Sequence, residues 1–248
     1  MSVVDWRERV LVAYLDEPPF GIPPGAGARP SGCDVEVAHR VLAEAGATEI
    51  EFELTTFPEL IPGLVEGRWH VSTAMFITDE RAPLVDFSRP VWAAADGFIV
   101  RRGEEGRFGS YEDIARADEA TLAVVTGQVQ RHTARDAGVP AERIIEFVDQ
   151  EAAAEAVRQR RADASASTAV GNVAYVERAG DGGLVAIADR PIGAERPQPL
   201  GAFAFSKETP ELTTAFDAVL ARYLGTAEHL ALMARHGFAR DDLAPALP

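Results

Sequence analysis

The side chain with the most specific chemical potential in this sequence is Arg81. It follows Asp79 and Glu80, which stand where a helical turn is expected to begin, shortly after a strand-length apolar run at residues 71–74. The guanidinium group presents a planar fork of N–H donors, which suits two-point capture of a carboxylate better than any other side chain. The sequence therefore predicts a carboxylate-binding arginine in the loop after a strand. The alternative is an ordinary surface arginine.

Predicted strands and helices alternate around this arginine. The predicted strands are residues 10–14, 51–54 and 71–74, and the predicted helices are residues 34–45 and 57–66. Asp34 is expected to cap the first helix, whose apolar side chains share one face, and Gly46 is expected to end it. Such a βαβαβ series predicts a mostly parallel sheet with helices on both faces.

A second series of the same kind occupies the middle of the chain. Its predicted strands are 121–125, 144–148, 162–167 and 184–187, its predicted helices are 128–137, 151–160 and 169–179, and two amphipathic helices, 210–224 and 227–236, end the chain. The apolar segments 97–100 and 201–205 flank this series and suit strands by which the chain leaves one lobe and returns to it. We therefore predict lobe 1 from residues 1–98 and 204–248, and lobe 2 from residues 99–203. The alternative is that both segments are edge strands of a single sheet.

Composition is that of a soluble globular protein and disfavours two kinds of partner. The 248 residues are 47% hydrophobic and 25% charged, with a formal net charge of −15. Such acidity argues against nucleic acid and anionic membrane surfaces. The one cysteine, Cys33, cannot form an internal disulfide and has no catalytic neighbours in the sequence, so we interpret it as a small apolar residue.

The localisation stays open at this point. Residues 1–9 lack the cationic and apolar regions of a leader, and no run reaches the length of a transmembrane helix. We expect an extracytoplasmic protein, periplasmic or at the cell surface, if an export signal has been removed, and a cytoplasmic one otherwise.

The residues around Arg81 also carry a family resemblance. Residues 77–81 (ITDER) and 85–88 (VDFS) resemble the ligand-carboxylate clamp of the family 3 extracellular solute-binding proteins, the amino-acid-type receptors of ABC importers. The likeness extends from Tyr14 to Leu243. It implies an α/β, two-lobed fold of the type II periplasmic-binding-protein kind, each lobe a mostly parallel sheet flanked by helices, with a two-strand hinge and a ligand in the interlobe cleft. It also implies a monomer that delivers a small molecule to a transporter permease and needs no cofactor.

The same resemblance assigns pocket residues in lobe 1. Phe20 and Phe57 occupy positions where the family usually keeps aromatic residues, and Phe76 stands where amino-acid receptors more often have Ser or Thr. Three aromatic faces would attract a cation by about 0.5–2 kcal/mol each. The alternative for each phenylalanine is a place in the core. Ala74 and Arg81, the two ends of segment 74–81, are also assigned to the pocket.

Lobe 2 departs from the family pattern at one position. Residues 161–168 (RADASAST) match a strand of the family, but Thr168 replaces the aspartate that holds the α-ammonium in amino-acid receptors. A buried ammonium without an anion is costly, so an ordinary L-α-amino acid is disfavoured and Glu17 is the candidate anion. Glu17 is otherwise a solvated turn carboxylate, and Thr168 otherwise an N-cap. Gly127 would let backbone N–H groups reach an anionic ligand, or is a simple turn.

The receptors of ectoine/hydroxyectoine importers resemble this chain in detail. Four segments of this chain match their motifs: residues 17–21 match NExPYG, residues 74–81 match AGMYITPER, residues 110–115 match RSYEDIA, and residues 126–130 match an AGAVE-like turn. The last segment contains Val129 and Gln130. Both ligands are cyclic amidinium carboxylates, which suit Arg81, Glu17 and the aromatic faces. The departures are Phe76 for tyrosine and Gln130 for glutamate.

Three other functions stay open: a polar amino-acid receptor, a cytosolic or receptor-linked sensor module, and a cyclohexadienyl-dehydratase-like enzyme. The enzyme would need an acid and a base, and the sequence offers Glu17 without a second titratable group near Thr168. We find no hydrolase motif, metal-spaced His/Cys set or phosphate loop, and we expect neither an enzyme nor a metal site.

Overall fold

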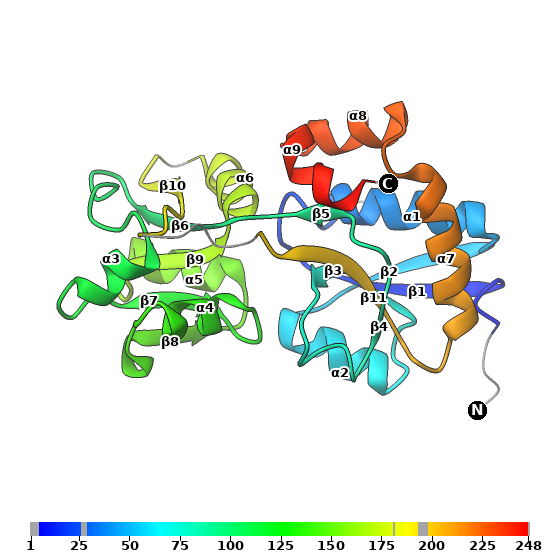
Figure 1. The fold of residues 1–248 in the computed structure, drawn as a ribbon, viewed down its shortest axis with the longest axis horizontal. Helices are drawn as coiled ribbons and strands as arrows, with labels where there is room; N and C mark the ends of the chain where they lie inside the picture. Colours follow the sequence, from blue (N-terminus) through cyan, green and yellow to red (C-terminus); the bar gives the residue numbers. More distant parts are fainter. Residues whose placement is uncertain (1–4, 26–28, 181, 193–197, 248) are drawn as a thin grey trace. The chain divides into compact units, whose positions relative to one another are not determined.

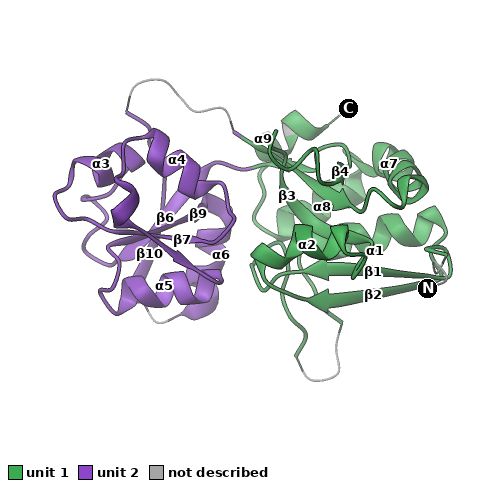
Figure 2. Cartoon of the chain, turned by 90° about the horizontal axis from the view of Figure 1, so that it is seen from below, with its two compact units in different colours: residues 1–93, 199–248 green, residues 94–198 purple. Residues whose placement is uncertain are grey.

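The chain divides into two compact units. A computed structural model describes residues 5–25, 29–180, 182–192 and 198–247. Unit 1 comprises Met1–Ala93 and Pro199–Pro248, and unit 2 comprises Ala94–Gln198 (Figure 2). The chain thus passes between the units after Ala93 and after Gln198, whereas the sequence predicts the boundaries after residues 98 and 203.

Unit 1 is built on a mixed sheet of strand order β2-β1-β3-β11-β4, with β5 also paired to β11 (Figure 1). Its strands are β1 (Arg9–Tyr14), β2 (Glu49–Leu54), β3 (Val71–Phe76), β4 (Asp86–Phe87), β5 (Trp92–Ala93) and β11 (Leu200–Phe205). Its helices are α1 (Cys33–Ala45), α2 (Leu60–Val65), α7 (Pro210–Tyr223), α8 (Ala227–Arg235) and α9 (Arg240–Leu243), with short 3-10 helices at Phe57–Glu59 and Ala244–Ala246. The strands β2, β1 and β3 are parallel, and β11 runs antiparallel to all its neighbours.

The first helix shows what its sequence specifies well and what it does not. Val35, Ala38 and Val41 are buried on one face of α1, and Gly46 ends the helix in the left-handed conformation, φ 103°. The prediction that Asp34 caps this helix is wrong. The N-cap is Gly32 and no side chain makes the cap, because the Asp34 carboxylate is hydrogen-bonded to other elements of unit 1.

Unit 2 has a five-stranded sheet of order β10-β6-β9-β7-β8. Its strands are β6 (Asp96–Arg101), β7 (Leu122–Val125), β8 (Ile144–Phe147), β9 (Ala164–Thr168) and β10 (Leu184–Ala188). Its helices are α3 (Tyr111–Arg116), α4 (Gln130–Asp136), α5 (Gln150–Arg158) and α6 (Ala169–Ala179), with a 3-10 helix at Ala141–Arg143. Two buried clusters fill the two faces. Phe98 and Val100 pack with α3 and α4, while Ile99 packs with α5 and α6.

The predicted fold class is confirmed, with one correction to the sheets. The parallel part is limited to β2-β1-β3 and β8-β7-β9, so the sheets are mixed and not mostly parallel. The segments predicted as crossing strands, β6 and β11, lie inside different sheets and run antiparallel to their neighbours. This excludes the alternative that both are edge strands of one sheet.

Among the described residues, no helix combines the length and the apolar character that crossing a bilayer requires.

Candidate functional site

Arg81 lies in a hydrogen-bonded turn that follows β3. Its backbone N–H donates to the carbonyl and the hydroxyl oxygen of Thr78, at 3.1 and 3.2 Å. The segment forms a turn without continuing into a helix. The side chain folds back and Nη1 donates to the carbonyl oxygen of Phe76 at 2.7 Å. Arg81 is therefore buried, only 8% exposed, and is not a surface arginine.

Burial lowers the pKa of Arg81 to about 10, while the charge of Glu80 acts in the opposite direction. The guanidinium therefore remains protonated at neutral pH. A buried cation is stabilised strongly by an anion that can share its donors. This part of unit 1 is thus suited to a carboxylate ligand.

Aromatic side chains lie around Arg81, and several of them contact one another. The Arg81 guanidinium lies over the Phe57 ring, 5.2 Å from its centroid. The ring of Phe76, whose carbonyl Arg81 binds, meets Trp92 edge to face with centroids 5.5 Å apart, and Phe20 lies on Trp92 at 5.0 Å. We call Phe20, Phe57, Phe76, Arg81 and Trp92 the aromatic–arginine cluster.

Trp92 was not identified from the sequence, although it joins two of the three predicted aromatics. It is the first residue of the two-residue strand β5, paired in register with Gly201 of β11. A Cβ atom at Gly201 would lie 2.3 Å from the Trp92 ring, so glycine is required where the ring crosses the strand. Phe238 extends the contact, with its centroid 6.0 Å from Phe20. A glycine opposite a tryptophan is visible only once the strand pairing is known.

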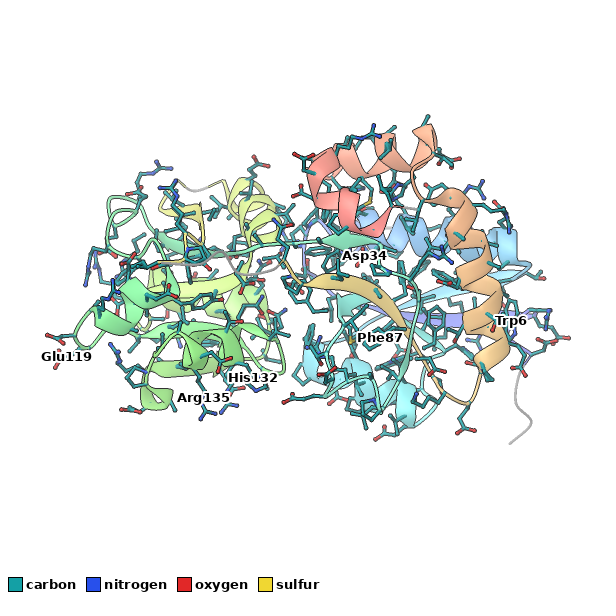
Figure 3. The ribbon with its side chains drawn as sticks, viewed as in Figure 1. Trp6, Asp34, Phe87, Glu119, His132 and Arg135 are labelled. Atoms are coloured by element: carbon teal, nitrogen blue, oxygen red, sulfur yellow. The ribbon has the colours of Figure 1, made fainter. Side chains whose placement is uncertain are left out.

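Asp34 is hydrogen-bonded to Trp92. It was not identified as a site residue from the sequence, because this contact too is visible only once the fold is known. Its Oδ1 accepts from Trp92 Nε1 at 3.0 Å, and its Oδ2 accepts from the Ala74 N–H at 3.0 Å. The Asp34 side chain is labelled in Figure 3. Ala74 lies where the pairing of β3 with β11 shifts register, and such bulges redirect backbone groups away from the ladder. One buried carboxylate therefore ties α1, β3 and β5 together beneath the cluster.

Burial raises the pKa of Asp34 to about 7, although the donors Trp92, Ala74 and Cys33 favour the ionised form. Cys33 itself is fully buried, as expected for a small apolar residue, and burial raises the pKa of its thiol.

Glu17 is half-buried in the turn after β1. Its backbone N–H and carbonyl both bond to Gly21, at 3.1 Å each, and its carbonyl also accepts from the Phe20 N–H at 3.0 Å. The same turn meets the start of α1, where the Asp34 N–H donates to the Phe20 carbonyl oxygen at 3.1 Å. The turn therefore brings both Glu17 and Phe20 to the region of the cluster.

The predicted residues of unit 2 lie at the carboxyl edge of its sheet. Thr168 ends β9, and its hydroxyl accepts from the Gly171 N–H at 3.1 Å, so it makes the N-cap of α6. Gly127 has φ 82°, a left-handed turn conformation that favours glycine. Val129 precedes α4, which begins at Gln130 and not at residue 128 as predicted. Gln130 is 2% exposed and donates from Nε2 to Asp96 Oδ1 at 2.7 Å.

Comparison with protein families gives one match across most of the chain. Residues 10–237 match the family model described as bacterial extracellular solute-binding proteins, family 3. A probable amino-acid ABC transporter periplasmic-binding protein, y4tE, of Sinorhizobium fredii is 31% identical over 248 residues, covering 98% of this chain and 82% of that protein.

Solved structures of other proteins resemble the whole fold. The structure of EhuB in complex with hydroxyectoine has a TM-score of 0.84 and 26% identity, covering 95% of this chain and 91% of that one. An ancestral arginine-binding protein bound to arginine has a TM-score of 0.77 and 25% identity, covering 92% of this chain and 97% of that one.

Proposed function

We propose a specific role from the premise that this chain belongs to the family 3 bacterial extracellular solute-binding proteins: it captures a small zwitterionic compatible solute, ectoine or hydroxyectoine, for ABC-type import. The captured ligand is delivered to a transporter permease. The protein acts outside the cytoplasm, as a monomer, and binds without catalysis.

The observation that carries this proposal is the aromatic–arginine cluster. In this cluster a buried, protonated guanidinium lies over the Phe57 ring and donates to the Phe76 carbonyl oxygen, and the Phe76 ring contacts Trp92. A carboxylate pairs with Arg81 through charge-assisted hydrogen bonds, while a cationic ring system lies against aromatic faces. Ectoine carries both features in one small molecule, with a carboxylate and a delocalised amidinium. Glu17, whose carbonyl oxygen accepts from the Phe20 N–H in the turn after β1, is the proposed partner of the amidinium.

Similarity to EhuB, solved with hydroxyectoine, supports the choice of ligand class. A polar amino acid is the second candidate, favoured by the relative named as an amino-acid ABC transporter periplasmic-binding protein. The two candidates share the carboxylate contact and differ in the cation. We propose Ala74, Gly127, Val129, Gln130 and Thr168, together with Glu17, Phe20, Phe57, Phe76 and Arg81, as the ligand-binding set.

Titration calorimetry against ectoine, hydroxyectoine, glycine betaine, glutamine, arginine and histidine tests the proposed ligand. We expect heat with ectoine or hydroxyectoine, and Glu17→Gln should weaken that binding by about 2 kcal/mol or more, because a charge-assisted contact is lost. Glu53→Gln is the matched control, since Glu53 is an exposed glutamate of β2 in the same unit. It should bind as the wild type does.

An amino acid that binds at micromolar concentration while ectoine gives no heat would replace the first candidate with the second. Thr168→Asp separates the two in another way. We expect it to give no gain for ectoine, because the amidinium is assigned to Glu17, and a gain for amino acids if their α-ammonium needs an anion at this position.

Small-angle scattering tests whether both lobes engage the ligand. The family resemblance implies hinge closure, so the radius of gyration should fall when saturating ligand is added. An unchanged radius at a ligand concentration that calorimetry shows to be saturating would contradict closure.

Genetic context distinguishes import from sensing. Adjacent permease and ATPase genes would favour a transporter component, while an adjacent regulator would favour a sensor module.

A dehydratase is the least favoured role. Asp34 is the one carboxylate of the described site whose pKa is strongly shifted, and it is buried and hydrogen-bonded to Trp92 and Ala74.

A further inference from the structure

Asp96, which the sequence did not single out, lies directly beside Thr168. The two residues are register partners in the antiparallel pair β6–β9. Residues that face each other in this way have Cβ atoms about 4.5–5.5 Å apart on the same side of the sheet. Asp96 therefore places a carboxylate one strand away from the position where Thr168 offers only a hydroxyl.

Two buried side chains hold the Asp96 carboxylate in place. Gln130 Nε2 donates to Oδ1 at 2.7 Å, and the Tyr111 hydroxyl donates to Oδ2 at 2.9 Å. Tyr111 is fully buried and Gln130 is 2% exposed, whereas Asp96 itself is only partly buried. Rigid, buried donors behind a partly exposed acceptor are the arrangement expected of a group that is positioned to meet a ligand.

Gln130 adds an independent observation. Because its Nε2 faces a carboxylate, the orientation of the amide is determined, and Oε1 points elsewhere. That oxygen is buried and has no hydrogen-bond partner among the described residues. A buried acceptor without a donor is unfavourable in a native structure and is often explained by a missing ligand or water. A ligand N–H group is a donor that would satisfy it.

We propose that Asp96 supplies the negative charge with which unit 2 selects a ligand that carries a positively charged, N–H-bearing group. Gln130 orients the carboxylate and accepts an N–H of the same ligand through Oε1. This inference rests on the proposed function, since it concerns the solute that the protein captures. It assigns to β6 the role that an aspartate at the end of β9 would otherwise have. For an amidinium, Asp96 is a second anion in addition to Glu17, and the assignment applies equally to a guanidinium or an ammonium.

Charge relocation tests the proposal with the full chain. Calorimetry is carried out with ectoine and arginine on the wild type, Asp96→Asn, Thr168→Asp and the double variant. Asparagine keeps the shape of Asp96 and removes its charge, so Asp96→Asn should weaken the bound solute by about tenfold or more. In the double variant the charge returns on the neighbouring strand and should recover about threefold or more of the affinity. Aspartate is also a good N-cap, so α6 keeps its cap.

A purely structural role for Asp96 would give a different pattern. Asp136→Asn, at the other end of α4 and exposed, is the matched control and should bind as the wild type does. Binding by Asp96→Asn within about twofold of the wild type, or a loss that Thr168→Asp does not recover, would overturn the assignment of Asp96. If the wild type binds no zwitterionic solute of the panel, the proposed function fails and this inference fails with it. If the wild type binds a solute and only the Asp96 variants depart from expectation, this inference alone fails.

Discussion

Arg81→Ala is expected to abolish measurable ligand binding while the protein remains folded. The ligand carboxylate would lose a buried, charge-assisted partner, an effect of about 3–5 kcal/mol. At the upper end this exceeds a thousandfold in affinity, which moves a micromolar ligand beyond the range of calorimetry. The fold should persist because the Arg81 side chain is not part of the hydrophobic core cluster of unit 1. Circular dichroism and thermal unfolding check this second point.

Two further variants make the result specific. Arg81→Lys keeps the charge but loses the planar fork, so its affinity should lie between those of the wild type and Arg81→Ala. Arg68→Ala is the matched control, because Arg68 also lies over an aromatic ring, that of Trp69 at 4.6 Å, but at the surface of unit 1. Near-wild-type binding by Arg81→Ala would remove the clamp from the proposed site.

Local patterns in the sequence were sufficient for most helices and strands. Gly46 ends α1 and Pro210 begins α7, as capping preferences predict, and α6 spans the residues predicted. The direction of β6 and β11 could not be predicted in this way. Whether a strand runs parallel or antiparallel is decided by its partners far along the chain, such as Ser167 for Gly97 and Met75 for Ala202.

The same division applies to the site. Arg81 and its turn are read from consecutive residues, so the sequence alone identified them. The sequence alone did not identify the other residues of the site, because their roles depend on contacts with residues about 40 or more positions away or in separate strands. These residues are Trp92, Asp34 and Asp96. Asp34 illustrates the reason for the error. An aspartate at the start of a helix is a common cap, but here two donors from other strands compete for both of its oxygens and displace that local role.

Asp34 also gives the second large expected effect, which is a dependence of stability on pH. Burial raises the pKa of Asp34 from 3.8 to about 7 in the folded protein. Between these values the folded state holds a proton that the unfolded chain has released, so Asp34 contributes stability that is fully present below about pH 4 and is lost as the pH rises through about 7. Asparagine does not titrate. The free energy of unfolding of the wild type, minus that of Asp34→Asn, should therefore fall between about pH 4.5 and 7.5, by the order of 3 kcal/mol.

Urea unfolding of both proteins at several pH values in this interval measures the difference. Two opposing physical effects decide its sign: burial penalises the charged carboxylate, while Trp92 Nε1 and the Ala74 N–H donate to it. A difference that falls with pH means that burial dominates. A difference that rises means that the two donors outweigh burial and that Asp34 is ionised in the folded protein at neutral pH.

Asp34→Ala separates this charge effect from the loss of bonding, because it leaves both buried donors without their acceptor at every pH. It should be destabilised by about 2–5 kcal/mol across the whole interval.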